Sequence, residues 1–212
     1  MSQTLQTYVT EVQRLLHDAN GNYWTVSELT DYINDARNRT VADTGCNRVL
    51  QTTTFVQGQE QYQYALFPQG ASTIDVLNVT LLWGNSRIVL GQMPFSEFNP
   101  KFRTYINLQS RPVCFARYGQ GSIYIGPIPD QTYSVELDTV VLPAALVNTS
   151  DVETGLVYPY TSPVAFYAAY KAKYKEQSYI EAQTFHDEYI KKAKEALVQT
   201  MTRSIPSLYS SL

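Results

Sequence analysis

Few side chains of this chain have the types and spacing that catalysis requires. The 212 residues include two histidines, His17 and His186, which lie far apart among polar neighbours in segments with helical spacing. His17 precedes Asp18 near a predicted helix end, where the helix dipole favours a positive side chain. We therefore interpret neither histidine as a catalytic base.

Two pairs of acidic residues could supply acid–base chemistry: Asp151 with Glu153, and Asp187 with Glu188. Glycoside cleavage needs two carboxyl groups that face each other across a cleft, which spacing alone does not establish. The sequence contains no metal-ligand cluster, nucleophile elbow or phosphate-binding glycine loop, since Gly119-Gln120-Gly121 is typical of a turn between strands. We predict that the protein is not an enzyme and holds neither a cofactor nor a metal.

Composition and charge exclude several kinds of partner. A net charge of −3 leaves no broad basic face for binding the phosphates of a nucleic acid. No apolar run approaches the length of a membrane span, and the first residues lack the apolar core of a signal peptide, so we expect no membrane partner. Cys46 and Cys114 lie far apart without a CxxC pattern, which indicates buried thiols in a reducing compartment.

The tyrosine content is high. Seventeen tyrosines and eight phenylalanines accompany ten glycines in a chain that is 44% hydrophobic and 17% charged, a composition typical of folded proteins. Tyrosine favours half-buried surfaces and interfaces because its ring is apolar and its tip is polar. It is also frequent on the faces of β-sheets. Composition does not choose between these two interpretations.

Helical spacing opens the chain. Apolar residues between Leu5 and Leu16 recur every three or four positions, which predicts an amphipathic helix that ends near Asn20-Gly21. A second helix that stops at Gly45 completes a predicted αα-hairpin over residues 1–49. The apolar stripe of this hairpin needs another helix to cover it.

The second helix begins with the clearest local signal in the sequence. Thr25 is a predicted N-cap, and Glu28 three residues later completes a capping box in which each side chain reaches the other's backbone N–H. Trp24 and Leu29 occupy the positions of a hydrophobic staple. Side-chain chemistry therefore predicts this helix boundary.

A long helical pattern closes the chain. It begins at Ser162-Pro163, a favoured pair for a helix start, and contains no further proline or glycine until Pro206. We predict one continuous helix over residues 162–203, roughly 60 Å long, which covers the hairpin or packs against other chains. Residues 204–212 follow as an extended tail, because Pro206 prevents helix continuation.

Between the helices, from residue 50 to 147, the apolar period changes from about 3.6 to 2. We predict an α+β fold in which an antiparallel β-sandwich or barrel-like domain is inserted into a helical bundle, followed by a linker loop over 148–161. Met93–Phe102 is predicted as a short helical turn or arm. Two hairpins and three further strands are predicted: Thr52–Val56 with Tyr62–Leu66, Ile74–Trp83 with Arg87–Leu90, Val113–Tyr118, Ser122–Gly126 and Thr132–Leu142.

Two segments resemble parts of the tailed-phage head-to-tail adaptor (connector) proteins. Residues 24–36, WTVSELTDYINDA, resemble the W-[ST]-x-x-E-L-x-x-Y-I-N-x-A opening of that family. Residues 121–133, GSIYIGPIPDQTY, resemble its later strand–PxPD–tyrosine element, and Pro143 and Leu146 match the Pro-x-x-Leu exit that follows. The order of the elements also matches. The motif residues are Trp24, Thr25, Glu28, Leu29, Pro127, Pro129, Asp130 and Tyr133.

The resemblance implies a structural virion protein. Adaptors of this family form a ring, usually of twelve copies, beneath the portal protein. The ring extends the DNA channel and provides a docking platform for the tail nozzle or tube or for tail-fibre proteins. Genomic DNA would pass through the ring without sequence-specific binding. The implied location is the neck of the virion, after synthesis in the host bacterial cytoplasm.

Two surfaces are expected to serve assembly. Apolar residues of the tail are expected in pockets of the portal protein, although a frayed terminus has the same sequence pattern. Charged residues of the long helix are expected to pair between subunits, unless they only face solvent. The expected portal contacts are Ile205, Pro206, Leu208, Tyr209 and Leu212, and the expected subunit contacts are Lys171, Lys175, Glu181, Glu188 and Lys192.

Two other functions stay open at this point. The chain could be another neck or tail-completion protein, or a host-receptor-binding module whose tyrosine-rich β insertion makes the contact. An adaptor should add to portal rings, whereas a receptor-binding module should bind cells or glycans and usually trimerise. For an adaptor we expect a monomeric free chain whose tail and 148–161 loop become ordered on binding, because rings formed in solution would compete with ordered assembly.

Overall fold

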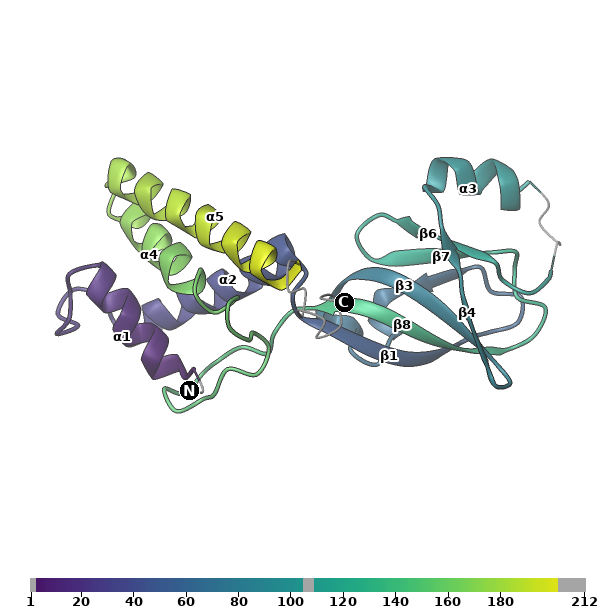
Figure 1. The fold of residues 1–212 in the computed structure, drawn as a ribbon, viewed down its shortest axis with the longest axis horizontal. Coiled ribbons are helices and arrows are strands. Elements are labelled where there is room, and N and C mark those ends of the chain that lie inside the picture. Colours follow the sequence, from purple (N-terminus) through teal and green to yellow (C-terminus); the bar gives the residue numbers. More distant parts are fainter. Residues whose placement is uncertain (1–2, 105–108, 202–212) are drawn as a thin grey trace, which may run out of the picture. The chain divides into compact units, whose positions relative to one another are not determined.

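The computed structural model describes residues 3–104 and 109–201. Within these residues the fold is mixed α+β, with five α-helices and two four-stranded sheets (Figure 1). The chain divides into two compact units: a helical unit, Met1–Cys46 with Pro143–Leu212, and a β unit, Asn47–Leu142. None of the helices in this part of the chain is both long and apolar enough to cross a membrane.

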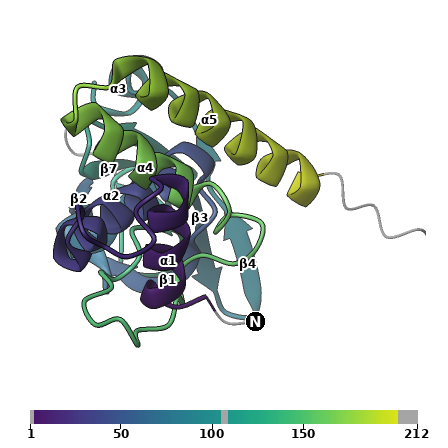
Figure 2. The ribbon, with the colours of Figure 1, turned by 90° about the vertical axis from the view of Figure 1, so that its left-hand side faces the viewer.

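Four helices build the helical unit, and α4 lies at its centre. This helix packs against α1, α2 and α5 (Figure 2), and four of its alanines, at positions 165, 168, 169 and 172, are fully buried. Their small side chains let the neighbouring helices approach closely. The helices are α1 (Leu5–Leu15), α2 (Val26–Thr44), α4 (Val164–Lys175) and α5 (Tyr179–Met201).

The helix α2 begins and ends at the predicted residues. Thr25 is its N-cap, and the Thr25 hydroxyl accepts a hydrogen bond from the Glu28 backbone N–H at 3.3 Å. The other half of the predicted capping box is absent, because the Glu28 carboxylate bonds instead to the side chains of Tyr32 and Lys175. Gly45 ends the helix with a φ of 62°, a left-handed conformation that glycine adopts without steric cost.

The prediction of one continuous helix over 162–203 is wrong. The structure contains α4 and α5, and the chain reverses direction between them at Glu176–Ser178. Gln177 has a φ of 63°, and the Ser178 N–H bonds to the Lys173 carbonyl at 3.1 Å, which is the geometry of a Schellman turn. The physical reason is burial, since a hairpin lets each helix cover the apolar face of the other, whereas a single long helix would expose both faces.

The helix α1 ends with a turn of the same kind, earlier than predicted. Its last residue is Leu15, and His17 has a φ of 58°. The Asp18 carboxylate then accepts hydrogen bonds from the backbone N–H groups of residues 22–24. These bonds, that from Trp24 first, hold the pKa of Asp18 below its ordinary value and shape the loop into α2.

The β unit contains two sheets with the strand orders β1-β8-β3-β4 and β2-β7-β6-β5. The predicted hairpin of Ile74–Trp83 with Arg87–Leu90 is confirmed as β3–β4. The predicted hairpin of Thr52–Val56 with Tyr62–Leu66 is wrong, because β1 pairs with β8 and β2 pairs with β7. The turn at Gly58 (φ 77°) instead carries the chain from one sheet to the other.

Among the described strands, β5 and β6 pair in parallel, and all other pairs are antiparallel. Residues of both sheets share one hydrophobic cluster, which includes Phe55, Leu81, Phe115 and Leu137. In β8 the odd-numbered residues are buried, as the alternation predicted. The two sheets form no closed barrel. The strands are β1 (Arg48–Phe55), β2 (Gln61–Gln63), β3 (Thr73–Trp83), β4 (Ser86–Val89), β5 (Gly91–Gln92), β6 (Cys114–Tyr118), β7 (Ser122–Gly126) and β8 (Tyr133–Val141).

The predicted arm at Met93–Phe102 is the helix α3 (Phe95–Phe102), which packs on the second sheet. Its Phe98 side chain is fully buried beside Cys114. Gly126 lies beneath this helix, where an added Cβ would come within 2.6 Å of the Phe98 ring, so the close approach requires glycine. Burial raises the pKa of the Cys114 thiol to about 11, which makes this cysteine an inert core residue.

Candidate assembly surface

The first motif segment, residues 24–36, contacts α4 through its side chains. The Glu28 carboxylate accepts a hydrogen bond from the Tyr32 hydroxyl at 2.7 Å and forms an ion pair with Lys175 of α4. The Lys175 ammonium also lies 5.7 Å from the centre of the Trp24 ring. The hydrogen bond from Lys175, and then that from Tyr32, holds the pKa of Glu28 below its ordinary value. Residues that sequence spacing assigned to a helix cap therefore also bind a second helix.

A second lysine repeats this arrangement one turn earlier in α4. Lys171 forms an ion pair with Asp35 and lies 5.7 Å from the centre of the Tyr32 ring. Burial, together with the hydrogen bond to Glu28, raises the pKa of Tyr32 to about 12. Glu28, early in α2, pairs with Lys175, whereas Asp35, later in α2, pairs with Lys171, which comes earlier in α4. The two helices are therefore antiparallel.

The helix α2 also holds the segment that follows the β unit in the chain. The Asn34 side-chain amide donates to the Leu146 carbonyl at 2.8 Å, and the Asn34 side-chain oxygen accepts from the Leu146 N–H at 2.9 Å. Both backbone groups of Leu146 are therefore satisfied by one side chain. Asn34 belongs to the first motif segment and Leu146 to the exit element, so the fold brings these two sequence signals together.

Arg37, one turn after Asn34, forms a buried ion pair with Glu153. The guanidinium donates to both carboxylate oxygens, from Nε at 2.6 Å and from Nη2 at 2.8 Å, and both side chains are 1% exposed. The remaining nitrogen, Nη1, donates to the Ala144 carbonyl at 2.8 Å and to Asn34 at 2.9 Å. This fork-like geometry fixes the segment from residue 144 to 153 against α2.

The environment keeps Glu153 ionised. Burial raises the pKa of Glu153, but the Arg37 guanidinium and the backbone N–H groups of Gly155 and Leu156 outweigh burial, so the pKa lies below its ordinary value. The Tyr8 hydroxyl of α1 donates to the same carboxylate at 3.4 Å, and burial raises the pKa of Tyr8. The network therefore joins α1, α2 and the 148–161 loop.

The 148–161 loop is tied to the start of α1 as well. The Leu5 N–H donates to the Asp151 carbonyl and the Gln6 N–H donates to the Thr149 carbonyl, both at 3.0 Å. In the single chain this loop already has a defined, hydrogen-bonded conformation. The expectation that it becomes ordered on binding stays a prediction.

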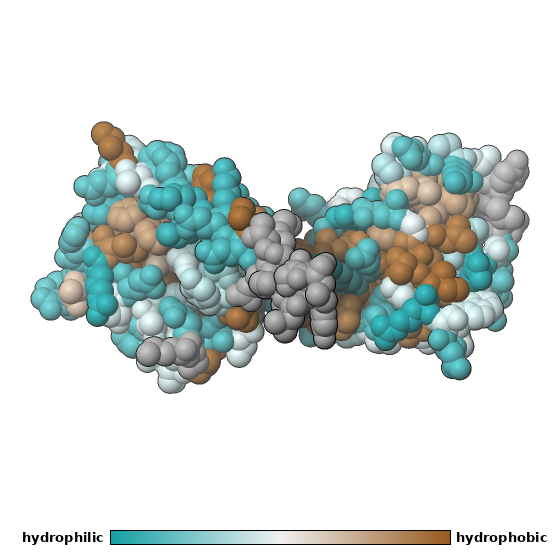
Figure 3. Space-filling view, in the orientation of Figure 1, coloured by the Kyte–Doolittle hydropathy of each residue, from teal (hydrophilic) through white to brown (hydrophobic). Residues whose placement is uncertain are grey.

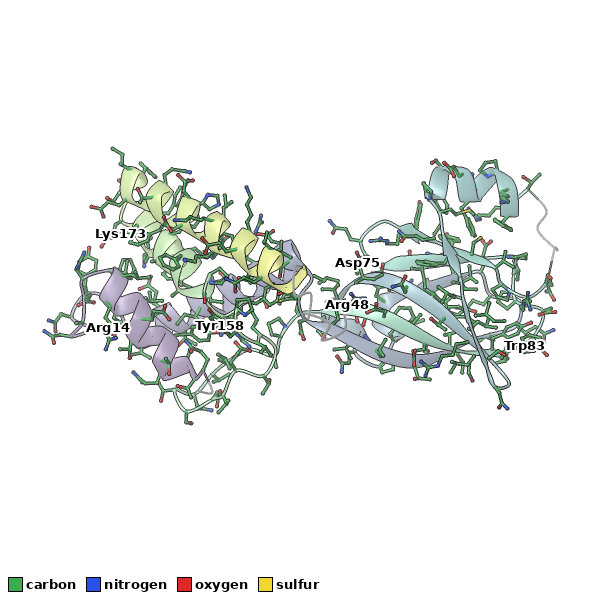
Figure 4. All side chains as sticks on the ribbon, viewed as in Figure 1. Arg14, Arg48, Asp75, Trp83, Tyr158 and Lys173 are labelled. Carbon is green, nitrogen blue, oxygen red and sulfur yellow. The ribbon has the colours of Figure 1, made fainter. Side chains whose placement is uncertain are left out.

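The second motif segment builds the β unit. The Tyr133 hydroxyl donates to Asp130 at 2.5 Å, and the Tyr133 ring stacks 5.5 Å from the ring of Trp83, which Figure 4 labels. The Pro129 carbonyl accepts a backbone hydrogen bond from the β1–β2 connection, and Pro127 lies between β7 and this turn. These residues shape the turn between β7 and β8.

An aromatic seam joins α4 and α5. Its tyrosine rings lie with their centres 5.0 to 5.9 Å from at least one other ring of the seam. The Tyr189 hydroxyl donates to Asp43 of α2 at 2.7 Å, whereas Tyr174 and Tyr179 are 56% and 58% exposed. The seam comprises Tyr167, Tyr170, Tyr174, Tyr179, His186 and Tyr189.

The five residues expected to pair between subunits all have ion-pair partners within the chain. Lys171 and Lys175 face α2, and Glu181 pairs with Lys173 near the α4–α5 turn (Figure 4). Exposed pairs of this kind hold their side chains weakly and can exchange partners. Their role between subunits stays a prediction. The remaining pairs are Glu188–Lys191 and Lys192–Glu195.

The residues considered for catalysis are dispersed. His17 lies in the turn after α1, and His186 lies in the aromatic seam. Asp151 accepts two backbone N–H groups of its own loop, which lower its pKa, and Asp187 accepts a hydrogen bond from Gln183. In the part of the chain that the structure describes, no group of three or more histidine, cysteine or acidic residues could hold a metal ion.

Sequence reasoning missed the roles of Asn34, Arg37 and Glu153. A signal was present, because Arg37 lies beside Ala36 on the apolar stripe of α2, where a charged residue needs a buried partner. The partner itself, 116 residues away, was not predictable from local pattern. The expected portal contacts in the tail, Ile205, Pro206, Leu208, Tyr209 and Leu212, lie outside the described residues and stay a prediction.

Comparison with known families covers nearly the whole chain. A family model described as "SU10 adaptor protein" matches residues 3–208. This range contains both motif segments and every helix and strand named above. No curated protein matches the chain.

Proposed function

Because the chain belongs to the SU10 adaptor protein family, a family of phage adaptors, we propose that it is a head-to-tail adaptor of the virion. Copies assemble as a ring of about twelve beneath the portal protein, at the neck of the virion. The ring extends the DNA channel and provides the docking platform for the tail nozzle or tube or for tail-fibre proteins. Genomic DNA passes through it without sequence-specific binding.

The observation that carries this proposal is the family match over residues 3–208. The contacts of the motif residues add support, because they hold the helical unit together and leave its outer faces exposed. Trp24, Glu28 and Asn34 are engaged with other helices and loops of the same chain. A rigid unit with free polar faces suits a protein whose task is to contact several partners at once.

Charge supports the proposed passage of DNA. The helical unit contains ten lysines and arginines against thirteen acidic residues, and the β unit contains six of each. Neither unit therefore has the basic excess that would retain DNA on its phosphates. Whichever unit lines the channel, DNA meets a neutral or mildly negative surface.

The alternative of a receptor-binding module gains less support. That hypothesis assigned the contact with the host receptor to tyrosines of the β insertion. Four of the described tyrosines in the β unit are buried, and Tyr118 is the exposed one. The exposed aromatic rings of the helical unit include Tyr23, Tyr174 and Tyr179. The tyrosine distribution therefore favours contacts made by the helices.

The test is addition of the purified chain to purified portal rings of the same virus, measured by mass photometry and sedimentation. We expect a monomer at micromolar concentration in the free chain and about twelve copies on each portal ring. A portal from an unrelated phage is the matched control and should stay bare. Self-assembly into trimers that ignore the portal would contradict the adaptor proposal.

The tail provides a second prediction. We expect deletion of residues 204–212 to reduce the number of copies per portal ring strongly, because apolar side chains of the tail fill portal pockets. A full-length variant in which Ile205, Leu208, Tyr209 and Leu212 are replaced by serine separates side-chain contacts from chain length. Undiminished attachment of both variants, with unchanged circular dichroism, would leave the tail without this role.

A further inference from the structure

We propose that neighbouring copies of this chain meet through α5 of one copy and α2 of the next, side by side and running in the same direction. This inference rests on the proposed ring and names the surfaces that build it. Three observations carry it: an exposed stripe on each helix, the charges on the two stripes, and the directions of the helices.

The first stripe runs along α5, opposite its buried face. The buried face carries Ala182, Tyr189, Ala193 and Ala196, which pack within the helical unit. The opposite face is exposed, and Figure 3 shows the visible surface over this helix as mainly hydrophilic with isolated hydrophobic residues. The stripe recurs every three or four positions and comprises Ile180, Thr184, Asp187, Lys191, Lys194 and Val198.

The second stripe runs along α2, opposite Leu29, Ile33 and Ala36, which are fully buried. Asp31 on this stripe has no ion-pair partner among the described residues, and the Asp35 side chain remains 54% exposed beside Lys171. The stripe comprises Ser27, Asp31, Asp35, Asn38 and Ala42, of which Asn38 is half-buried and the others are exposed.

The two stripes are complementary in charge when the helices are parallel. With the start of the α2 stripe beside Asp187, each carboxylate faces an ammonium or hydroxyl donor. A shift of one turn would place Asp31 beside Asp187, and these like charges would repel. In the favoured register the facing pairs are Ser27–Asp187, Asp31–Lys191, Asp35–Lys194 and Asn38–Val198.

The directions of the helices fit a ring. The ion pairs with Lys171 and Lys175 show that α2 is antiparallel to α4, and the turn at Gln177 makes α5 antiparallel to α4 as well. The helices α2 and α5 of one chain therefore run the same way and flank α4 (Figure 2). A ring of about twelve copies rotates each neighbour by about 30°, so α5 of one copy and α2 of the next remain close to parallel.

This contact is polar, and that explains why copies would not associate in solution. Exposed ion pairs contribute little individually and are screened by salt. On a portal ring, neighbouring copies are held together at a high effective concentration, where weak contacts become sufficient. The ring would therefore form on its template and not before.

Charge reversal tests the contact. We expect Asp31→Lys or Lys191→Glu alone to lower the number of copies per portal ring to roughly half or less, because like charges then face each other. The variant with both changes should recover full rings, since each contact regains one lysine and one glutamate. Arg14→Glu, which reverses an exposed charge on α1 away from both stripes, is the matched control. Full rings from both single variants would overturn the proposal, as would failure of the double variant to recover.

Cysteine cross-linking tests the register independently. On portal rings, oxidation of the Ser27→Cys/Asp187→Cys chain should give a ladder of covalent multimers, because every copy offers both faces. The Ser27→Cys/Val198→Cys chain should not, because those positions meet in an antiparallel, two-fold contact that closes as a dimer. The parent chain, which has Cys46 and Cys114, is the background control. Dimers from the second variant would overturn the parallel arrangement.

The two proposals fail in different ways. If the parent chain does not add to portal rings at all, the adaptor function fails. The Ser27→Cys/Asp187→Cys chain is then oxidised alone at high concentration and low salt, where a ladder supports the contact and its absence overturns it. If the parent chain fills portal rings while the charge and cysteine variants behave as unmodified protein, the function stands and the proposed contact is wrong.

Discussion

At the scale of single residues, the most constrained group is the ion pair of Arg37 and Glu153. Both side chains are 1% exposed, so each charge depends on the other for the interactions that water would provide. Such a pair is weak evidence for high stability, because desolvation offsets much of the attraction. Its role here is positional: it holds the 148–161 loop in one place against α1 and α2.

Removing one partner leaves the other buried and uncompensated. We expect Arg37→Met, which keeps most of the side-chain volume, to lower the free energy of unfolding by about 3–5 kcal/mol. Urea unfolding followed by circular dichroism at the helix band measures this change. Glu188→Gln removes an exposed carboxylate that pairs with Lys191 and should change little. Equal effects of the two variants would contradict the buried role of Arg37.

The same pair predicts a pH dependence. The pKa of Glu153 is lowered in the folded state, so its stabilising contribution is present above its ordinary pKa of 4.5 and is lost as pH falls through the lowered value. We expect the stability difference between the parent chain and Glu153→Gln to shrink as pH falls below the ordinary pKa of 4.5 and through the lowered pKa of Glu153. Comparing the two chains cancels other carboxylates with lowered pKa values, such as Asp18 and Asp151. A difference that stays constant with pH would argue against this assignment.

At the scale of elements, the α4–α5 turn decides the shape of the helical unit. Ser178 precedes Glu181 by three residues, which is the S-x-x-E spacing of a capping box, and α5 begins directly after Ser178. The Ser178 N–H bonds instead to the Lys173 carbonyl, and the hydrogen bond from the Lys173 side chain lowers the pKa of Glu181. Sequence reasoning recognised the same pattern at Thr25 but not here, because glycine and proline were taken as the markers of a helix end.

The turn contains a residue in an unfavourable conformation. Gln177 has a φ of 63°, which costs a non-glycine residue about 1–2 kcal/mol. We expect Gln177→Gly to raise the free energy of unfolding by about 1 kcal/mol, after the entropy that glycine loses on folding. Gln183→Gly, inside α5, should lower it by a similar amount. If both glycine variants lose stability in urea unfolding, the left-handed turn does not determine the helix break.

Strand pairing shows the same limit of local signals. The segment of β1 was predicted as half of a hairpin, yet its partner is β8, which lies some eighty residues further along between β1 and β3. The buried face of β8 was correctly predicted from alternation, because alternation depends on the strand itself. The partner depends on which sheet buries that face, and this is a property of the whole β unit.

At the scale of the whole molecule, the chain combines two units with different net charge. The helical unit has the acidic excess, the aromatic seam and the two exposed stripes, whereas the β unit is neutral and has its own core. For an adaptor, the helical unit is therefore the proposed site of contacts between copies. The family match spans both units, so the adaptor function belongs to the chain as a whole.

The sequence by itself determined the features that depend on neighbouring residues. These include the start of α2 at its capping signal, the alternating faces of β8, the β3–β4 hairpin and the two motif segments that point to phage adaptors. Each rests on interactions within a few positions of the chain, such as a cap bonding to its own helix. Local chemistry is sufficient for them.

The tertiary structure decided the features that depend on burial between distant residues. The Asn34 side chain bonds to Leu146 and the Arg37 side chain bonds to Glu153, each across more than one hundred residues of the chain. The predicted long helix is instead the pair α4 and α5, which fold back on each other. Local propensity allowed a continuous helix through Gln177, but covering the apolar faces of α4 and α5 stabilises the reversed chain. The free energy of such contacts belongs to the folded molecule, and no short segment of the sequence contains it.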